Sequence, residues 1–583
     1  MLHKVIIAII FCLITNTANA TTYYVDFDTG SDTAAGTSTG TAWKTLPGTR
    51  NVGDTAYITT SYGGGVISTT NKVPCGTVLV LKLGTTHDIS DGNRIDLRTG
   101  AGEFYNDCTS ASYTTFTTDS SWGTGQVILD GTSFTTAYPI VYIRVNGVKW
   151  DGISNYTIKI QDSPRQGILA YDGSGAPVND IAVEHLEFYN NGTECTSGSE
   201  CLGPAQLQIR YSNNFSVDNV LIEGNSNHIT GFTTGETNQY GIGTISNSIS
   251  RNHAGNDPPN DTGMGFSAEN SQLTFTNCLS YSNLKGWDLG QGGSTDYTIN
   301  YKVINSSAYN NGYSGISMNN KGSNFDETTY PVKYYIINSV IRDNGKYGIE
   351  HYCGPYETHI VHNIVDNNGG GWTNQCGGNL RIGPCANNTD NQTIKGYVYN
   401  NAMYKPLDNS NICEFHHDSD GQAPAGGTDF SLYSNYNSWR QSGTEDQFAM
   451  FAFSKDGGLG DDSSTYTYSS VGNTSENWYL KYSNTIEPEP PLFGIGHYHA
   501  DANSVTTEPP FTDVVNHNYT LTSLYPGTNI SSQPWYISEM GTDRNGTTRS
   551  TWDIGAYEYM SGICTNCKNS NRTKSDGFGG GFQ

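Results

Sequence analysis

The sequence predicts an all-β protein, a right-handed parallel β-helix (β-solenoid) with an N-terminal cap and a C-terminal loop-rich extension. The first observation behind this prediction is a strand-and-turn motif that recurs about every 30 residues in the middle of the chain. The second is composition: the 583 residues include 68 Gly and 39 Tyr, and only 15% are charged. Such a chain favours strands and turns over helices.

The repeat consists of an apolar strand, Asn-Gly turn chemistry and a second short strand. From residue 247 onward the start-to-start steps are 30, 28, 33 and 25 residues. One such unit cannot bury its apolar face alone, so neighbouring units stack into a continuous core. We expect the recurring Asn to form turn ladders from coil to coil rather than a binding site. The clearest copies are 219–225, 277–283, 305–311 and 338–344, with weaker ones from His185, Asn247 and Asn363.

The chain divides into five predicted parts. Residues 1–20 read as a signal peptide, because Lys4 precedes an apolar run and Ala18-Asn19-Ala20 forms a small-residue cleavage site. The mature chain would start near Thr21 and has no later segment apolar enough to span a membrane. The other predicted parts are the cap and first coils (21–180), central coils (181–405), C-terminal coils, insertions and a closing strand (406–560), and a disordered Gly-rich tail (561–583).

The cysteines suggest which disulfides the chain could form. In an oxidising compartment, local disulfides are plausible for Cys75 with Cys108, Cys195 with Cys201, and Cys376 with Cys385. Cys278 lies in an apolar strand and is expected to be a buried thiol.

The net charge of −25 argues against a nucleic-acid partner. A polyanionic substrate would need a cation or a local basic strip to offset that charge.

The second strand of each repeat follows a frame of Gly, apolar, variable, apolar, and the variable position defines an outward column. Rungs about 4.8 Å apart would place Asp288 and Glu350 roughly 9–10 Å apart, a separation suited to acid and base work. Asp288 with Glu269 or Asp261 could instead hold Ca²⁺. Arg381 could neutralise a uronate or act on its C5 proton, and a plain solvated ladder is the competing interpretation. The predicted exposed column is Ser267, Asp288, Ser317, Glu350 and Arg381.

Both ends of the chain resemble the pectate-lyase-like parallel β-helix superfamily, through residues 23–46 and Asp553–Tyr559 as a closing strand. The stretch Leu284–Leu289 resembles one in family nine polysaccharide lyases, whose Asp residues bind Ca²⁺ and whose Lys, one coil later, removes a proton. The resemblance assigns Asp288 to the last of those Asp. Leu284 and Lys285 stand in place of the Asp pair, and Ser317 falls near the expected Lys, with Lys321 four residues on.

The predicted function is a secreted lyase that cleaves a uronate polymer by β-elimination. The alternatives are an inverting glycoside hydrolase using Asp288 and Glu350, or a non-enzymatic adhesin, spike or filament subunit. The partner would be a polysaccharide, with a monomer expected for an enzyme and an oligomer for a structural protein. Catalytic candidates are Asp288, Glu350, Arg381, Lys321 and His351; substrate contacts are Lys285, Ser317, Tyr352 and Trp372, with Tyr313 and Tyr347 near the groove.

Overall fold

The computed structural model consists of strands joined by turns, and no α-helix occurs among the residues it describes. These residues form two compact units, residues 1–193 with 212–221, and residues 194–211 with 222–583. The finer division into five parts stays a prediction. The described residues are 21–51, 56–135, 138–154, 156–192, 205–225, 230–235, 240–253, 263–291, 299–320, 332–352, 356–369, 377–383, 393–405, 412–418, 429–441, 450–454, 464–467, 496–500 and 509–559.

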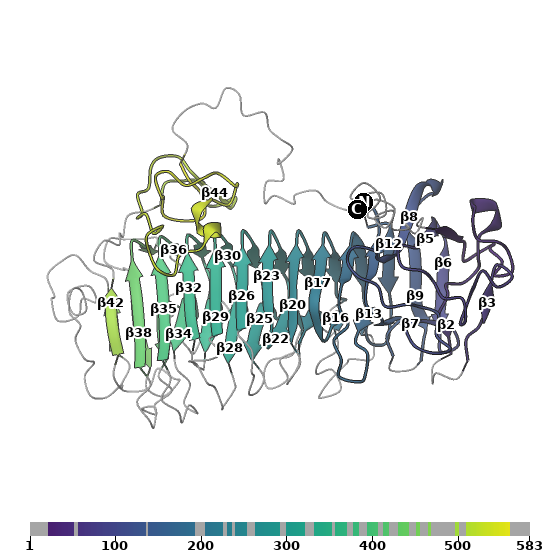
Figure 1. Ribbon diagram of the computed structural model, residues 1–583. Coiled ribbons are helices and arrows are strands. Elements are labelled where there is room, and N and C mark those ends of the chain that lie inside the picture. The colour runs from purple at the N-terminus through teal and green to yellow at the C-terminus, as the bar shows by residue number, and fades with distance from the viewer. Residues whose placement is uncertain are drawn as a thin grey trace, which may run out of the picture. The chain divides into compact units, whose positions relative to one another are not determined.

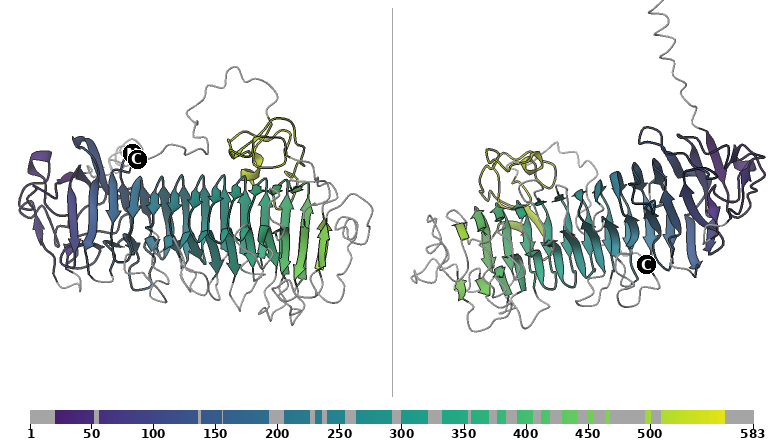
Figure 2. Two further views of the ribbon diagram at one scale, coloured as in Figure 1. Left: turned by 180° about the vertical axis from the view of Figure 1, so that it is seen from behind. Right: turned by 60° about the horizontal axis from the view of Figure 1, so that its bottom comes forward.

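The first unit stacks its strands into three sheets (Figures 1 and 2). The pairing is parallel except between β2 and β7. One sheet contains β1 (Thr22–Val25), β5 (Val78–Leu83), β8 (Thr114–Gly123), β11 (Val148–Asp151), β14 (Ile181–Glu184) and β17 (Ser212–Asp218). The second contains β2 (Thr49–Arg50), β7 (Arg94–Arg98), β10 (Val141–Arg144) and β13 (Ile168–Ala170), and the third β6 (Thr86–Ser90), β9 (Val127–Ser133), β12 (Ile158–Gln161) and β15 (Leu186–Tyr189). The short elements are η1 (Thr39–Thr41) and the hairpin β3 (Ser61–Tyr62) and β4 (Ile67–Ser68).

The second unit repeats the same three-sheet coil, with β18 (Leu221–Glu223) at its boundary. One sheet contains β20 (Gly241–Ser246), β23 (Gln272–Thr276), β26 (Ile299–Ile304), β29 (Val332–Ile337), β32 (Tyr356–Val361), β35 (Thr393–Tyr399), β38 (Asp429–Asn435) and β42 (Gly496–Ala500). The second contains β16 (Ala205–Ile209), β19 (Thr230–Thr234), β22 (Met264–Glu269), β25 (Lys285–Gln291), β28 (Ser314–Asn320), β31 (Tyr347–Tyr352), β34 (Gly377–Gly383), β37 (Ile412–Asp418), β40 (Met450–Ser454) and antiparallel β41 (Ser464–Thr467). The third contains β21 (Ile249–Arg251), β24 (Leu279–Tyr281), β27 (Ser307–Tyr309), β30 (Val340–Arg342), β33 (Ile364–Asp366), β36 (Ala402–Lys405) and β39 (Ser438–Gln441). The predicted right-handed parallel β-helix is confirmed.

Asparagines hold the turns, as predicted. The first Asn of the motif adopts positive φ, for example 56° at Asn277 and 53° at Asn338. The last Asn forms a buried ladder: Asn311 Nδ2 donates to Asn344 Oδ1 at 2.8 Å, and Asn344 Nδ2 donates to Asn368 Oδ1 at 2.7 Å. Each rung therefore satisfies the backbone and side-chain groups of the next, which keeps the coils in register.

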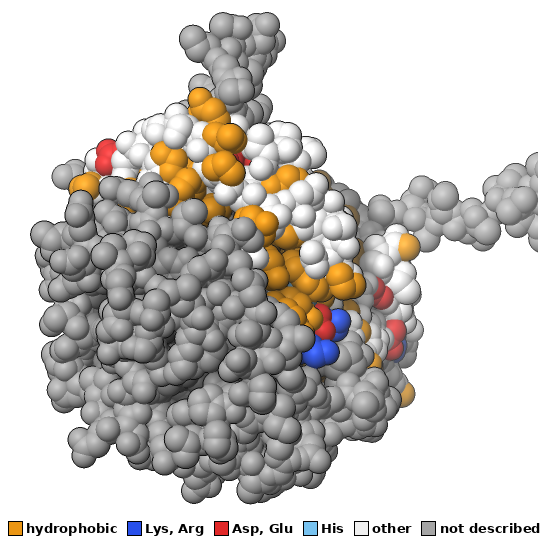
Figure 3. Space-filling model, turned by 90° about the vertical axis from the view of Figure 1, so that its left-hand side faces the viewer, with side chains coloured by type: hydrophobic (Ala, Val, Ile, Leu, Met, Phe, Trp, Pro, Cys, Tyr) orange, Lys and Arg blue, Asp and Glu red, His pale blue; other side chains and the backbone are white. Residues whose placement is uncertain are grey.

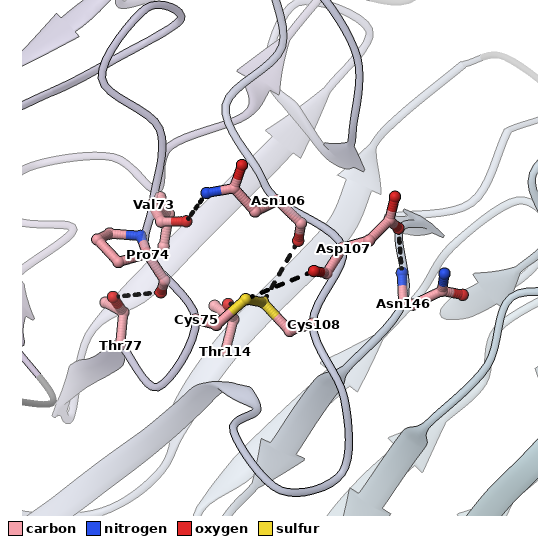
Figure 4. Close-up of a disulfide and its surroundings, with 9 residues drawn as sticks. All are labelled: Val73, Pro74, Cys75, Thr77, Asn106, Asp107, Cys108, Thr114 and Asn146. Atoms are coloured by element: carbon pink, nitrogen blue, oxygen red, sulfur yellow. Dashed lines mark hydrogen bonds between the residues drawn. A yellow bond between two sulfur atoms is a disulfide. The ribbon is translucent and has the colours of Figure 1, made fainter. Parts of the chain in front are cut away.

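The predicted disulfide between Cys75 and Cys108 is confirmed; it ties two loops of the first unit together (Figure 4). Cys278 is 2% exposed, and its thiol donates to backbone carbonyls, which confirms the expected buried thiol. The other two predicted pairs, the signal segment and the tail lie outside the described residues.

Residues 509–559 return along the second unit and pack against β30, β33 and β36 (Figure 1). They include β43 (Phe511–Asp513), β44 (Asn518–Leu521) and η3 (Ser538–Gly541). The closing strand predicted at Asp553–Tyr559 is wrong, because this stretch makes one isolated bridge, from Asp553 to Pro526. Its apolar side chains cover the coil surface instead of extending a sheet. Viewed from the end at β42, the described surface is mainly hydrophobic or uncharged (Figure 3).

Within the described part of the chain, no helix is long and apolar enough to cross a bilayer.

Candidate functional site

The predicted column exists in the second unit, on the sheet formed by β22, β25, β28, β31 and β34 (Figure 1). Asp288 pairs with Ser267 on one side and Ser317 on the other. Ser317 pairs with Glu350, and Glu350 pairs with Arg381. The flanking residues Trp287, Ile316 and Ile349 are 0% exposed in the core, so strand alternation turns the column to the outer face.

The expected exposure of this column is wrong for three of its members. Ser317 is 4% exposed, Glu350 5% and Arg381 8%, whereas the Asp288 side chain keeps 20%. An outward direction does not ensure contact with solvent, because the long side chains on this face pack over one another. Glu350 and Arg381 therefore belong to a buried polar layer outside the apolar core.

Both carboxylate oxygens of Glu350 are engaged. Arg381 Nη1 lies 2.6 Å from Oε1, and Ser314 Oγ donates to Oε2 at 2.9 Å. The Arg381 guanidinium also lies over the Tyr347 ring, 5.2 Å from its centroid. A carboxylate held this way orients its neighbours and is poorly placed to move a proton as a general acid or base.

Asp288 contacts Lys285, whose Nζ lies 3.1 Å from its Oδ1. Ca²⁺ takes six to eight oxygen ligands at roughly 2.3–2.6 Å, usually several of them carboxylates. In the described surroundings of Asp288, the Lys285 ammonium instead contacts the carboxylate of Asp288 itself. Glu269 is exposed and pairs with Gly290 rather than with Asp288, and Asp261 lies outside the described residues. The described residues around Asp288 do not fit the calcium site.

A lysine–tyrosine cluster, made of Lys285, Tyr313 and Lys346, lies beside this column. Lys346 Nζ donates to the Tyr313 hydroxyl at 2.7 Å and lies 4.6 Å from the ring centroid. Lys285 Nζ lies 5.8 Å from the same centroid. Tyr313 is half-buried, while Lys285 is 5% and Lys346 6% exposed. A phenol oxygen that accepts a hydrogen bond from one ammonium, on a ring with a second ammonium near it, is suited to exchange a proton next to a bound anion.

The cluster arises from stacked turns. Tyr313 N donates to Leu284 O, and Lys346 N donates to Tyr313 O, both at 2.7 Å. Leu284, Tyr313 and Lys346 each stand two residues before the Gly of the frame. Sequence reasoning missed Lys346. Extending the frame two residues toward the N-terminus would have found it.

His351, predicted as a catalytic residue, lies in the core rather than on the outer face. Its side chain is 0% exposed, contacts Thr358 and packs at the edge of the Tyr334 ring. Burial lowers the pKa of His351 well below its ordinary value, so it stays neutral within the core. His362 is also buried, and it adopts φ 58° at the turn position that Asn takes in other repeats.

Three other predicted residues lie wholly or partly outside the described part of the chain. Lys321 and Trp372 lie outside the described residues. The backbone of Tyr352 ends β31 and pairs with Asn319 and Gly383, and its side chain lies outside the description.

Among the described residues, one group of three side chains could hold a metal ion: Asp151, Glu184 and His185, with ligand atoms within 4.8 Å of one another. Lys149 Nζ lies 3.2 Å from Asp151 and 2.8 Å from Glu184. This ammonium already supplies the positive charge that the two carboxylates need.

No family model matches the chain, and no curated protein matches it. Among solved structures, the A-module of the mannuronan C-5 epimerase AlgE6 from Azotobacter vinelandii is 12% identical, with a TM-score of 0.39 over 74% of this chain and 91% of that chain. Pectate lyase Pel9A is 14% identical, with a TM-score of 0.34 over 92% and 96%. A rhamnogalacturonan lyase is 14% identical, with a TM-score of 0.37 over 68% and 84%. The likeness to these parallel β-helix proteins concerns the fold.

Proposed function

We propose that this protein is a secreted polysaccharide lyase that cleaves a uronate-containing polymer by β-elimination. The observation that carries the proposal is the lysine–tyrosine cluster, in which the Tyr313 hydroxyl accepts a hydrogen bond from Lys346 and a second ammonium lies nearby. Secretion is supported by the charged, apolar and small-residue succession of residues 2–20.

β-Elimination needs three contributions from the protein: neutralisation of the uronate carboxylate, a base for the C5 proton, and an acid for the leaving oxygen. The uronate carboxylate must be neutralised, so that the adjacent C5 proton becomes acidic, and in this proposal Lys285 does this by exchanging its ion pair with Asp288 for the substrate carboxylate. A base must remove that proton, and Tyr313 as phenolate would take it. The electrons of the C5–H bond form the C4–C5 double bond while the C4–O4 bond breaks. The proton held by Tyr313 then passes to the leaving oxygen.

Glu350 and Arg381 act as positioning residues in this proposal. Their ion pair holds the Arg381 guanidinium over the Tyr347 ring. No proton passes through either residue. The inverting hydrolase is less well supported, because it requires Glu350 to work as an acid or base while both its oxygens are engaged. No step of the proposed reaction is routed through calcium.

A screen of uronate polymers tests the proposal. The purified protein is incubated with polygalacturonate, alginate and glycosaminoglycans, and the absorbance of the unsaturated product is followed with EDTA or with added Ca²⁺. We expect absorbance to rise on at least one polymer. New reducing ends without that absorbance would indicate the hydrolase. Neither product on any polymer, together with ordered oligomers in negative-stain images, would indicate the structural protein.

Lys346 acts as a positioning residue for Tyr313 through its hydrogen bond to the hydroxyl, and this role is tested on the polymer that reacts. Lys346→Gln should lower kcat about a hundredfold with little change in KM, since it removes the hydrogen bond to Tyr313. Lys333→Gln is the matched control, because Lys333 forms a more exposed ion pair with Glu357 at 3.2 Å. Equal losses in both variants would contradict the assigned role.

A further inference from the structure

The outer face of β7 and β10, in the first unit, carries an unusual set of side chains. Ile95, Leu97 and Ile143 are 0% exposed and point into the core. The alternate positions hold arginines, one aspartate and one tyrosine; across the two strands Tyr142 pairs with Asp96 and Arg144 with Arg98. We call this set the arginine face: Arg94, Asp96, Arg98, Tyr142 and Arg144.

Asp96 is the shared carboxylate of the arginine face and is 0% exposed. Arg94 Nη2 lies 2.9 Å from Oδ2, and Arg98 Nε lies 3.0 Å from both oxygens. Arg144 Nε is more distant, at 3.6 Å from Oδ1. The carboxylate is thus taken up mainly by Arg94 and Arg98, and Arg144 adds a third positive charge to the same face.

Arg144 is held in place by an aromatic ring. Its guanidinium carbon lies 3.6 Å from the Tyr142 centroid, so the two planes are in contact. Its Nε is buried without a hydrogen-bond partner, and the side chain is 18% exposed. A guanidinium fixed in orientation loses little entropy when it binds a carboxylate or sulfate through two parallel hydrogen bonds.

An aromatic side chain adjoins the same face. Tyr138 is 38% exposed, and the Arg94 guanidinium lies 4.7 Å from its ring centroid. Exposed aromatic rings suit the flat faces of sugars. The oriented Arg144 guanidinium and the partly exposed Tyr138 ring together fit an acidic sugar better than a free inorganic anion.

We propose that the arginine face is a binding subsite for the acidic group of a saccharide, with Arg144 as the residue that contacts the oxyanion. In a chain of net charge −25, this face is a local basic strip of the kind that a polyanion would need. The site lies in a different compact unit from the lysine–tyrosine cluster and does not depend on the proposed lyase reaction.

Protection from an arginine-directed reagent tests the proposal without any turnover. The wild-type protein is treated with phenylglyoxal alone or with hexagalacturonate, a sulfated galactan oligosaccharide, or neutral maltohexaose, and modified peptides are quantified by mass spectrometry. We expect at least a fivefold slower modification of Arg144 with one acidic oligomer and none with maltohexaose. Protection by the first or the second acidic oligomer distinguishes carboxylate from sulfate. Arg251, whose side chain is 31% exposed, serves as the internal reference.

Calorimetry with the protecting oligomer gives the second readout. Arg144→Gln should weaken binding about tenfold, while Lys159→Gln should not. Lys159 is a close match, with 18% side-chain exposure, an ion pair to Glu187 and a tyrosine ring 4.4 Å away. Arg144→Lys keeps the charge and serves if the Gln variant does not fold. Unchanged modification of Arg144 with both acidic oligomers, or unchanged affinity in a folded Arg144 variant, would overturn the proposal.

Discussion

Glu350→Gln is expected to destabilise the central coils far more than Asp288→Asn, although both residues belong to one column. Glu350 is 5% exposed and holds the Arg381 guanidinium at 2.6 Å. Removing its charge leaves a buried cation without its carboxylate, which costs about 3 kcal/mol. Asp288 keeps 20% exposure and one ion pair at 3.1 Å, so its loss costs about 0.5 kcal/mol.

Native-state hydrogen exchange measures this difference locally, which suits a solenoid whose coils can open separately. A loss of 3 kcal/mol corresponds to about 100-fold faster exchange in β31 and β34, against about twofold for Asp288→Asn in β25. First-unit peptides serve as the internal control. Comparable acceleration in the two variants, or none for Glu350→Gln, would refute the assignment of Glu350 to a buried ion pair.

Three further predictions concern stability. Asn344→Ala should cost about 3 kcal/mol in urea unfolding, because Asn344 accepts from Asn311 and donates to Asn368 within the buried ladder, whereas exposed Asn516→Ala should cost under about 0.5 kcal/mol. Burial raises the pKa of Asp366 to about 7 from its ordinary 3.8, so wild-type stability should fall as pH rises from about 4 to about 7. Asp366→Asn should then be the more stable protein at pH 8, with the advantage absent near pH 4, as a melting-temperature series would show. Trp535→Ala should speed limited proteolysis of residues 509–559, since this side chain belongs to the cluster that docks the returning segment; an unchanged digestion rate would contradict that.

The register of the column could be predicted from sequence because its frame is strict. Steps of 29, 33 and 31 residues bring Asp288, Ser317, Glu350 and Arg381 onto successive rungs, as the pairing confirms. A slip of one residue would turn polar groups into the core, so the pattern has one solution.

Burial on the outer face could not be predicted in the same way. Strand alternation predicts which side chains point to the outer face. It does not predict which long side chains pack over that face and cover the others. Glu350 is covered because Ser314 reaches it from the preceding rung and Arg381 from the following one. Lys346 was missed for a related reason, since it lies in a turn outside the strand frame and meets Tyr313 through stacking of turns.

The central claim is that Tyr313 transfers the proton in a β-elimination, and Tyr313→Phe tests it most directly. The rate of unsaturated-product formation is measured on the reacting polymer for this variant and for Tyr309→Phe. Tyr309 is a matched control from the preceding strand, where it stacks on Tyr281 at 4.9 Å. We expect Tyr313→Phe to lose at least a thousandfold in kcat with the fold intact, and Tyr309→Phe to stay within about twofold of wild type. Full activity in Tyr313→Phe would contradict the proposed mechanism.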